Sequence, residues 1–138
     1  MGYRSTVKIM LEEKAYEMVK ASINAFNDKQ KKDYEDPMPY VFRPHEDKVT
    51  DDNVHILSWY DVKWYESFED VQSVMNVLHD LDDKDKYLDM TGFAYKLIKI
   101  VKDGMIIEET NTYDGFGEDF YTYTGIVEPV TVGEVKWE

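Results

Sequence analysis

The first half of the chain has the pattern of a strand, a helix and a second strand. Residues 3–11 are rich in β-branched and aromatic positions and follow a glycine, which predicts a strand. Residues 12–27 place their apolar side chains on one helical face, with glutamates in the first turns, where the helix dipole favours acids. Residues 53–65 are strongly β-prone and predict a second strand with a bulge near Ser58.

The clearest helix signal follows this second strand. Ser67 and Asp70 have the spacing of a capping box, with Asp in place of the usual Glu. Five apolar residues then recur at helical spacing: Val71, Val74, Met75, Leu78 and Leu81. We therefore predict a helix from Phe68 to about His79, followed by a polar turn over residues 82–86.

A hairpin is predicted after this turn. Residues 90–102 alternate between two apolar faces, which is typical of a long strand. Asp103 and Gly104 suit the positive φ values of a tight hairpin turn. Residues 105–112 are therefore expected to form the returning strand.

Two further segments have weaker patterns. Residues 33–52 contain three prolines and many charges, which predicts a long loop, with an edge strand around residues 40–42 as an open alternative. Residues 113–119 form a glycine-containing loop, and residues 120–127 predict another strand. The last residues allow only a short edge strand that ends near Trp137.

Together these elements predict a single domain of the α+β class over residues 1–138. The expected order is β-α-β-α-β-β-β, with room for one more strand. We expect an antiparallel or mixed sheet of about five or six strands that carries both helices on one face. A ferredoxin-like variant with an extended hairpin fits this order best.

Composition narrows the class of protein. Of the 138 residues, 43% are hydrophobic and 33% are charged, which is enough for a core inside a polar surface. The chain contains no cysteine, so disulfides, thiolate metal sites and cysteine nucleophiles are excluded. No apolar run approaches the length of a membrane span, and the N-terminus lacks the pattern of a secretory signal. We therefore expect a cytoplasmic protein without a membrane partner.

The net charge of -13 is unevenly distributed along the chain. Residues 1–50 hold nine basic and nine acidic groups, whereas residues 51–138 hold seven basic and 20 acidic groups. Such a negative field repels nucleic acid and attracts a basic protein surface. We expect the surplus carboxylates to share one exposed face. The alternative, that acidic groups simply keep a small protein soluble, stays open.

Motifs for catalysis or for metal and phosphate binding are incomplete. The three histidines lack the spacing of a metal site, and His55 is expected to be a strand residue. An acidic turn that begins at Asp80 lacks the glycine and the glutamate of a calcium loop. Residues 113–119 lack the third glycine and the helix of a phosphate cradle. We expect no cofactor and no metal, although a hydrolase that uses paired carboxylates stays open.

Aromatic residues are concentrated in the second predicted strand. Trp59, Tyr60, Trp64 and Tyr65 exceed what one strand face can bury, and exposed Trp and Tyr often anchor interfaces. Their burial under the helices or under the long loop is the open alternative. Combined with the acidic tail, this pattern predicts the following partner-binding residues: Trp64, Tyr65, Asp114, Glu118, Asp119, Tyr121 and Tyr123.

Three segments carry a resemblance to a known group. They are the opening residues 1–5 (MGYRS), residues 62–65 (VKWY) before the second helix, and the hairpin with residues 95–100 (YKLIKI) and Glu108-Glu109. The chain resembles small acidic proteins of bacteriophages and prophages over the first strand and roughly residues 54–110. The resemblance transfers no catalytic residue. It implies a phage accessory protein that acts in the host cytoplasm, where such proteins often bind host proteins and some imitate the charge of DNA.

The leading expectation is a non-enzymatic protein that binds and inhibits a basic host protein through an acidic, aromatic surface. It would bind no nucleic acid directly and would be a monomer or a homodimer, since a free sheet edge can pair with a second copy. The alternative is a small-molecule or nucleotide-binding protein in which aromatic pairs sandwich a base and residues 33–52 form a lid. Positive charge for that ligand would come from Arg4, Lys29, Lys31, Lys32 and Arg43.

Overall fold

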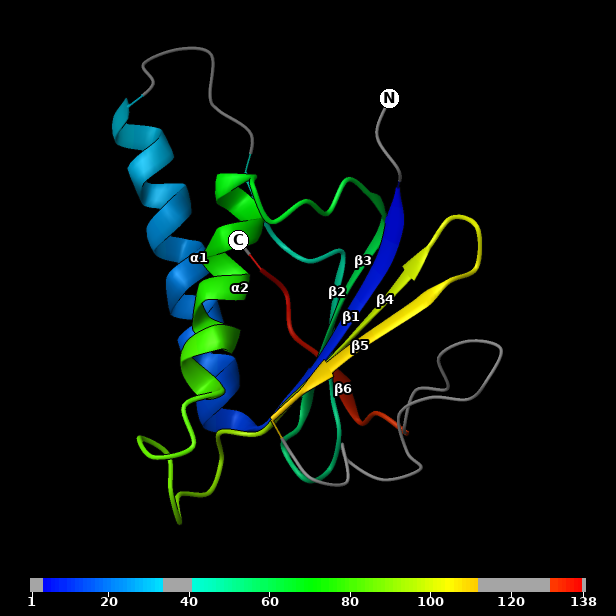
Figure 1. The fold of residues 1–138 in the computed structure, drawn as a ribbon. Coiled ribbons are helices and arrows are strands. Elements are labelled where there is room, and N and C mark those ends of the chain that lie inside the picture. Colours follow the sequence, from blue (N-terminus) through cyan, green and yellow to red (C-terminus); the bar gives the residue numbers. More distant parts are fainter. Residues whose placement is uncertain (1–3, 34–40, 112–129, 138) are drawn as a thin grey trace.

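The computed structural model describes residues 4–33, 41–111 and 130–137, and Figure 1 shows their arrangement. These residues form two helices and six strands. The elements are β1 (Ser5–Leu11), α1 (Glu13–Asp33), β2 (Glu46–Val49), β3 (His55–Val62), α2 (Glu69–Leu81), β4 (Tyr95–Val101), β5 (Ile106–Thr110) and β6 (Gly133–Glu134).

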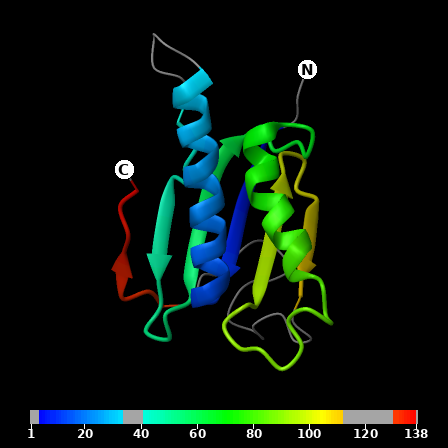
Figure 2. The same cartoon turned by 90° about the vertical axis from the view of Figure 1, so that its left-hand side faces the viewer.

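The six strands form one antiparallel sheet in the order β5-β4-β1-β3-β2-β6. Its four central strands, with α1 after β1 and α2 after β3, have the order β4-β1-β3-β2 of a ferredoxin-like fold. β5 and β6 extend this unit at its two edges. Both helices lie side by side on one face of the sheet (Figures 1 and 2), so the predicted α+β class is confirmed.

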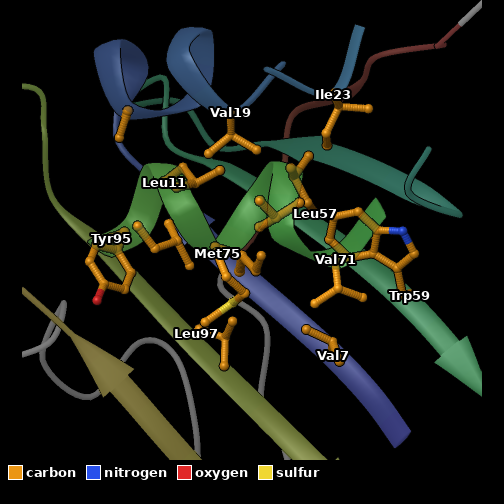
Figure 3. Packing of buried hydrophobic residues seen from close by; sticks show 14 of the residues in the cluster. Val7, Leu11, Val19, Ile23, Leu57, Trp59, Val71, Met75, Tyr95 and Leu97 are labelled. Atoms are coloured by element: carbon orange, nitrogen blue, oxygen red, sulfur yellow. The ribbon is translucent and has the colours of Figure 1, made fainter. Parts of the chain in front are cut away.

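The core lies between the helices and the sheet (Figure 3). Alternate residues of the strands point toward the helices, and the apolar faces of α1 and α2 cover them. The labelled members in Figure 3 include Val7, Leu57 and Leu97 from the sheet and Val19 and Met75 from the helices. Each fully buried side chain of this size contributes about 1.5–3 kcal/mol of hydrophobic free energy.

The second helix follows its predicted apolar pattern but not its predicted cap. All five apolar residues of the pattern are buried, as expected. The N-cap is Phe68, and it makes no side-chain capping hydrogen bond. The carboxylate of Asp70 instead accepts the adjacent backbone N–H of Val71 at 2.7 Å. The capping box with Ser67 was therefore wrong, and burial of the apolar face positions the helix.

A bulge in β3 explains how its aromatic residues separate. Ser5 and Val7 of β1 pair with Val62 and Trp59 of β3. The pairing therefore advances by two residues along β1 and by three along β3, which is the signature of a bulge in β3. Asp61, which lies between these two β3 residues, has a positive φ.

 At 53°, this φ lies in the left-handed region that accommodates the extra residue. Trp59 therefore points into the core and Tyr60 away from it, as the alternation predicts, although the bulge lies beyond Ser58.

The segment predicted as a long loop contains β2, which the sequence did not predict. Residues 41 and 42 are not a strand, although they were the alternative for one. The side-chain amide of Asn27 donates to the carbonyl of Phe42 at 2.7 Å and accepts its N–H at 2.9 Å. Since α1 supplies these hydrogen bonds, Phe42 is held against the helix and packs into the core. The strand predicted over residues 120–127 lies outside the described residues.

A smaller apolar cluster lies on the sheet face opposite the main core. Met10, Ile56 and Ile98 form it, and all three are buried. Lys8 and Lys96 are also buried; Lys8 donates to the hydroxyl of Tyr60 at 3.0 Å, and Lys96 pairs with Glu108 at 3.4 Å. As for membranes, neither described helix is long and apolar enough to cross one.

Candidate functional site

A groove of about 1040 Å³ lies where the turn after α2 meets the start of β4 and the end of β5. We call it the acidic groove. Its charged lining residues are Glu12, Asp82, Asp83, Asp89, Glu108, Glu109 and Lys84. Six carboxylates and one ammonium give this lining a formal charge of 1 − 6 = -5. The groove therefore presents a local negative field to any molecule that enters it.

Hydrogen bonds hold the floor of the groove in place. The buried Tyr95 donates its hydroxyl to Asp82 at 2.8 Å, and its backbone N–H donates to the side-chain oxygen of Asn111 at 2.8 Å. The amide nitrogen of Asn111 donates to the carbonyls of Phe93 at 2.8 Å and Leu81 at 3.2 Å. Asn111 thus joins the end of α2, the start of β4 and the end of β5. Burial, then the hydrogen bond to Asp82, raises the pKa of Tyr95 well above its usual value.

The start of α1 is fixed against the same region. The Glu12 carboxylate accepts the N–H of Ala94 at 3.0 Å, and the N–H of Ala15 donates to the carbonyl of Gly92 at 2.9 Å. Gly92 has a φ of +90°, and a Cβ at this position would lie 3.2 Å from side-chain atoms of Lys14. The positive φ favours glycine at this position, and a Cβ would in addition require the exposed Lys14 side chain to shift by a few tenths of an ångström.

Aromatic and apolar side chains complete the groove. The rings of Tyr87 and Phe93 lie 4.8 Å apart. The Tyr87 hydroxyl donates to Asp80 at 2.6 Å, and this hydrogen bond lowers the pKa of Asp80 and raises that of Tyr87. Leu88 and Met90 are 69% and 57% exposed. Carboxylates beside aromatic faces suit lysine and arginine side chains, which combine charge with an apolar stem.

The carboxylates of the groove differ in their availability to a ligand. One oxygen of Asp83 already accepts the backbone N–H groups of residues 85 and 86, at 3.2 and 3.1 Å. Glu108 pairs with Lys96. For Asp89 and Glu109, no side-chain hydrogen bond or ion pair is found within residues 4–33, 41–111 and 130–137. These two carboxylates are therefore the first candidates to meet a cationic ligand.

The structure assigns the predicted contact residues to different environments. Trp64 is only 5% exposed and packs against Trp59 at 5.0 Å between ring centroids, so it is a core residue and not an exposed anchor. The bulge in β3 turns it inward. Tyr65 is half-buried, with its ring edge-on to Phe68 at 5.3 Å. The remaining five predicted contact residues lie outside the described residues. They are Asp114, Glu118, Asp119, Tyr121 and Tyr123.

The surplus carboxylates do not all share one face. Residues 51–138 contain 15 described carboxylates, of which five line the acidic groove. Others lie at the far ends of the elements that build the groove, such as Glu69 at the start of α2 and Asp103 in the turn between β4 and β5. The expectation of a single acidic wall is thus wrong for the described residues, and a smaller concave site takes its place.

A buried polar cluster on the opposite side of the domain centres on Asp47. Its carboxylate accepts hydrogen bonds from Tyr16 at 2.5 Å and from the indole of Trp137 at 2.8 Å, and it pairs with His55 at 3.0 Å. The rings of Tyr16 and His55 stack with centroids 3.5 Å apart. Burial, then the hydrogen bond to Asp47, raises the pKa of Tyr16 well above its usual value. This cluster joins α1, β2, β3 and the last described residues, which indicates a structural role.

Neither metal-ligand geometry within the described residues nor comparison with known proteins indicates another functional site. Among the residues that the structure describes, no group of three or more histidine, aspartate or glutamate side chains is arranged to hold a metal ion. Comparisons of the chain with protein-family models, with curated proteins and with solved structures found no match. Function is therefore inferred from the geometry of the residues described above.

Proposed function

We propose that the protein is a binding protein whose acidic groove receives a basic segment of another protein. The observation that carries this proposal is the lining of the groove, where six carboxylates and one ammonium surround a concave surface with aromatic and apolar side chains. Lysine and arginine side chains would place their charges at Asp89 and Glu109. Their stems, and neighbouring apolar residues, would contact Leu88 and Met90.

The size and composition of the groove favour a peptide segment over a single ion. A volume of about 1040 Å³ lies at the upper end of the range for pockets that enclose small molecules, and it admits several side chains. Exposed ion pairs contribute only about 0–1 kcal/mol each. The apolar contacts would therefore supply much of the affinity, and the carboxylates would mainly supply orientation and a fast, salt-dependent association.

The same charge disfavours nucleic acid as a direct ligand, because phosphates and carboxylates repel each other. The resemblance to small acidic phage proteins adds a second part to the proposal. In that setting the partner would be a basic host protein in the cytoplasm, and occupation of its basic surface would inhibit it.

Two double variants with equal charge changes test this proposal. Asp89→Lys with Glu109→Lys reverses two carboxylates in the groove, whereas Asp51→Lys with Asp52→Lys reverses two exposed ones outside it. The wild-type protein should capture a basic partner from bacterial lysate at low salt and release it at high salt. The groove variant should bind that partner at least about tenfold more weakly, and the control within about twofold of wild type.

Equal losses in both variants would mean that only the overall charge matters, which would overturn the groove as the site. Failure to capture any partner at any salt concentration would count against the function itself.

A further inference from the structure

A second cavity, of about 280 Å³, lies at the opposite end of α2 from the acidic groove. We call it the Trp59 pocket. Four aromatic and two cationic side chains in its lining are Phe42, Trp59, Trp64, Phe68, Arg4 and Lys63. They come from four segments: the residue before β1, strand β3, the chain between β3 and α2, and the segment before β2. The pocket therefore lies where these four segments meet the helix.

Trp59 carries a buried hydrogen-bond donor that the fold leaves unpaired. The residue is 1% exposed, and its indole nitrogen Nε1 has no hydrogen-bond partner in the part of the chain that the structure describes. In Figure 3 this nitrogen lies on the side of the ring turned away from Leu57 and Met75. Buried donors without a partner are rare in native proteins, and buried Trp N–H groups usually find one. A ligand in the pocket that carries an acceptor would supply the missing partner.

The aromatic lining favours a planar ring. The rings of Phe42 and Trp59 are nearly parallel, with centroids 5.6 Å apart, and the ring of Trp64 lies 5.0 Å from that of Trp59. Phe68 is 42% exposed at the N-cap of α2. A pocket of this volume holds one ring system rather than a large ligand.

The charged side chains favour an anion. Arg4 and Lys63 are exposed, and one Arg4 nitrogen donates to the carbonyl of Asp61 at 2.8 Å. Asp70 also lines the pocket, but its carboxylate accepts the N–H of Val71. Two cations and one anion leave the lining with a formal charge of 2 − 1 = +1, in a protein whose net charge is -13.

We propose that the Trp59 pocket binds the ring of a small planar aromatic anion. An acceptor on the inner edge of the ring takes the N–H of Trp59, and the negative group lies outside, between Arg4 and Lys63. A mononucleotide has this chemistry, with a base carbonyl and a phosphate. An aromatic carboxylate with a second oxygen on its ring has it as well. This site is independent of the acidic groove and of the partner proposed for it.

NMR spectroscopy of the nitrogen-15-labelled protein tests the proposal directly. The chain contains three tryptophans, so the spectrum has three indole N–H signals, and each one reports on a single side chain. The probes are uridine monophosphate and 4-hydroxybenzoate, each compared with its neutral counterpart, uridine or phenol. The Trp59 signal should shift with at least one anion and saturate, whereas the Trp137 signal, whose N–H already donates to Asp47, should stay in place. Each neutral counterpart should bind about tenfold more weakly than its anion.

Three variants separate specific binding from an unspecific effect. Trp59→Phe removes the donor but keeps a ring, and should weaken binding about threefold to tenfold. Lys63→Glu should weaken binding of the anion at least about tenfold and leave the neutral counterpart nearly unchanged. Lys29→Glu makes the same charge change at an exposed position of α1 outside the pocket lining, and should have less than about a twofold effect.

A response to the nucleotide alone identifies a nucleotide as the ligand class, and a response to 4-hydroxybenzoate alone identifies an aromatic acid. The proposal is overturned if the Trp59 signal stays fixed with both anions at millimolar concentration. Equal effects of Lys63→Glu and Lys29→Glu would overturn it too. Because Lys63 is exposed, this second comparison remains decisive even if Trp59→Phe prevents folding.

Discussion

Replacement of Asp47 by alanine tests how the edge of the sheet is held. Asp47 is 1% exposed, and its two oxygens contact Tyr16, His55 and Trp137. Asp47→Ala therefore leaves two buried or half-buried donors without their acceptor and removes the partner of the histidine. It also removes the hydrogen-bonded link that runs from Trp137 through this carboxylate to Tyr16 of α1 and His55 of β3.

The magnitude follows from these contacts. A buried donor that loses its acceptor costs about 1–3 kcal/mol, and Asp47→Ala removes three such contacts at once. The contacts share one carboxylate, so their costs do not add in full. We expect Asp47→Ala to lower the free energy of unfolding by about 3–5 kcal/mol. Asp47→Asn keeps one acceptor oxygen and should cost about half as much.

Equilibrium unfolding in urea, followed by circular dichroism, measures this change. Asp51→Ala, four residues away in the exposed turn after β2, is the matched control and should change the free energy of unfolding by less than about 0.5 kcal/mol. A loss of less than about 1 kcal/mol for Asp47→Ala would refute the reasoning, since it would mean that the three side chains find other partners at little cost.

Three further predictions concern stability. The folded state keeps the phenols of Tyr16 and Tyr95 protonated above their usual pKa of about 10, so the free energy of unfolding should be unaffected below pH 10 and fall above it, by up to about 1.4 kcal/mol per pH unit for each. Urea titrations at several alkaline pH values measure this, and a flat profile would contradict it. Gly104 has a φ of +97° and open space around it, so Gly104→Ala should lower the free energy of unfolding by about 1–2 kcal/mol through backbone conformation alone. An unchanged urea midpoint would show that the turn tolerates alanine. Ile56→Ala should lower the melting temperature and cost about 2–5 kcal/mol, because this side chain is fully buried on the face opposite the helices; a surface-like effect below about 0.5 kcal/mol would contradict that burial.

Local patterns predicted those elements whose stability depends mainly on their own apolar spacing. The buried face of α2, the two faces of β4 and the turn at Gly104 all follow from residues close together in the sequence. β2 was missed because its four residues, EDKV, have a strand conformation only through their neighbours β3 and β6. The burial of Asp47 likewise depends on Tyr16 and Trp137, which are far away in the sequence.

The candidate site was harder to predict than the fold. The sequence predicted the acidic residues after α2 only as a polar turn over residues 82–86. Their grouping with Glu108 and Glu109 depends on Asn111, whose side chain joins the end of β5 to the end of α2 and the start of β4 by hydrogen bonds. These hydrogen bonds connect residues far apart in the sequence, so the spacing of residues along the chain does not predict them. The aromatic pairs did indicate a special region. A bulge at Asp61 places Trp64 inward, and the buried indole N–H of Trp59 has no partner among the described residues and lies in the lining of a cavity.

The most direct test of the acidic groove is a map of backbone amide shifts in the labelled protein during titration with a lysine- and arginine-rich peptide. The largest shifts should fall on residues 82–89 and 108–111, and they should diminish at high salt. Shifts that are equally large around Asp51 and Asp52, or that concentrate on α1, would contradict a binding site in the groove.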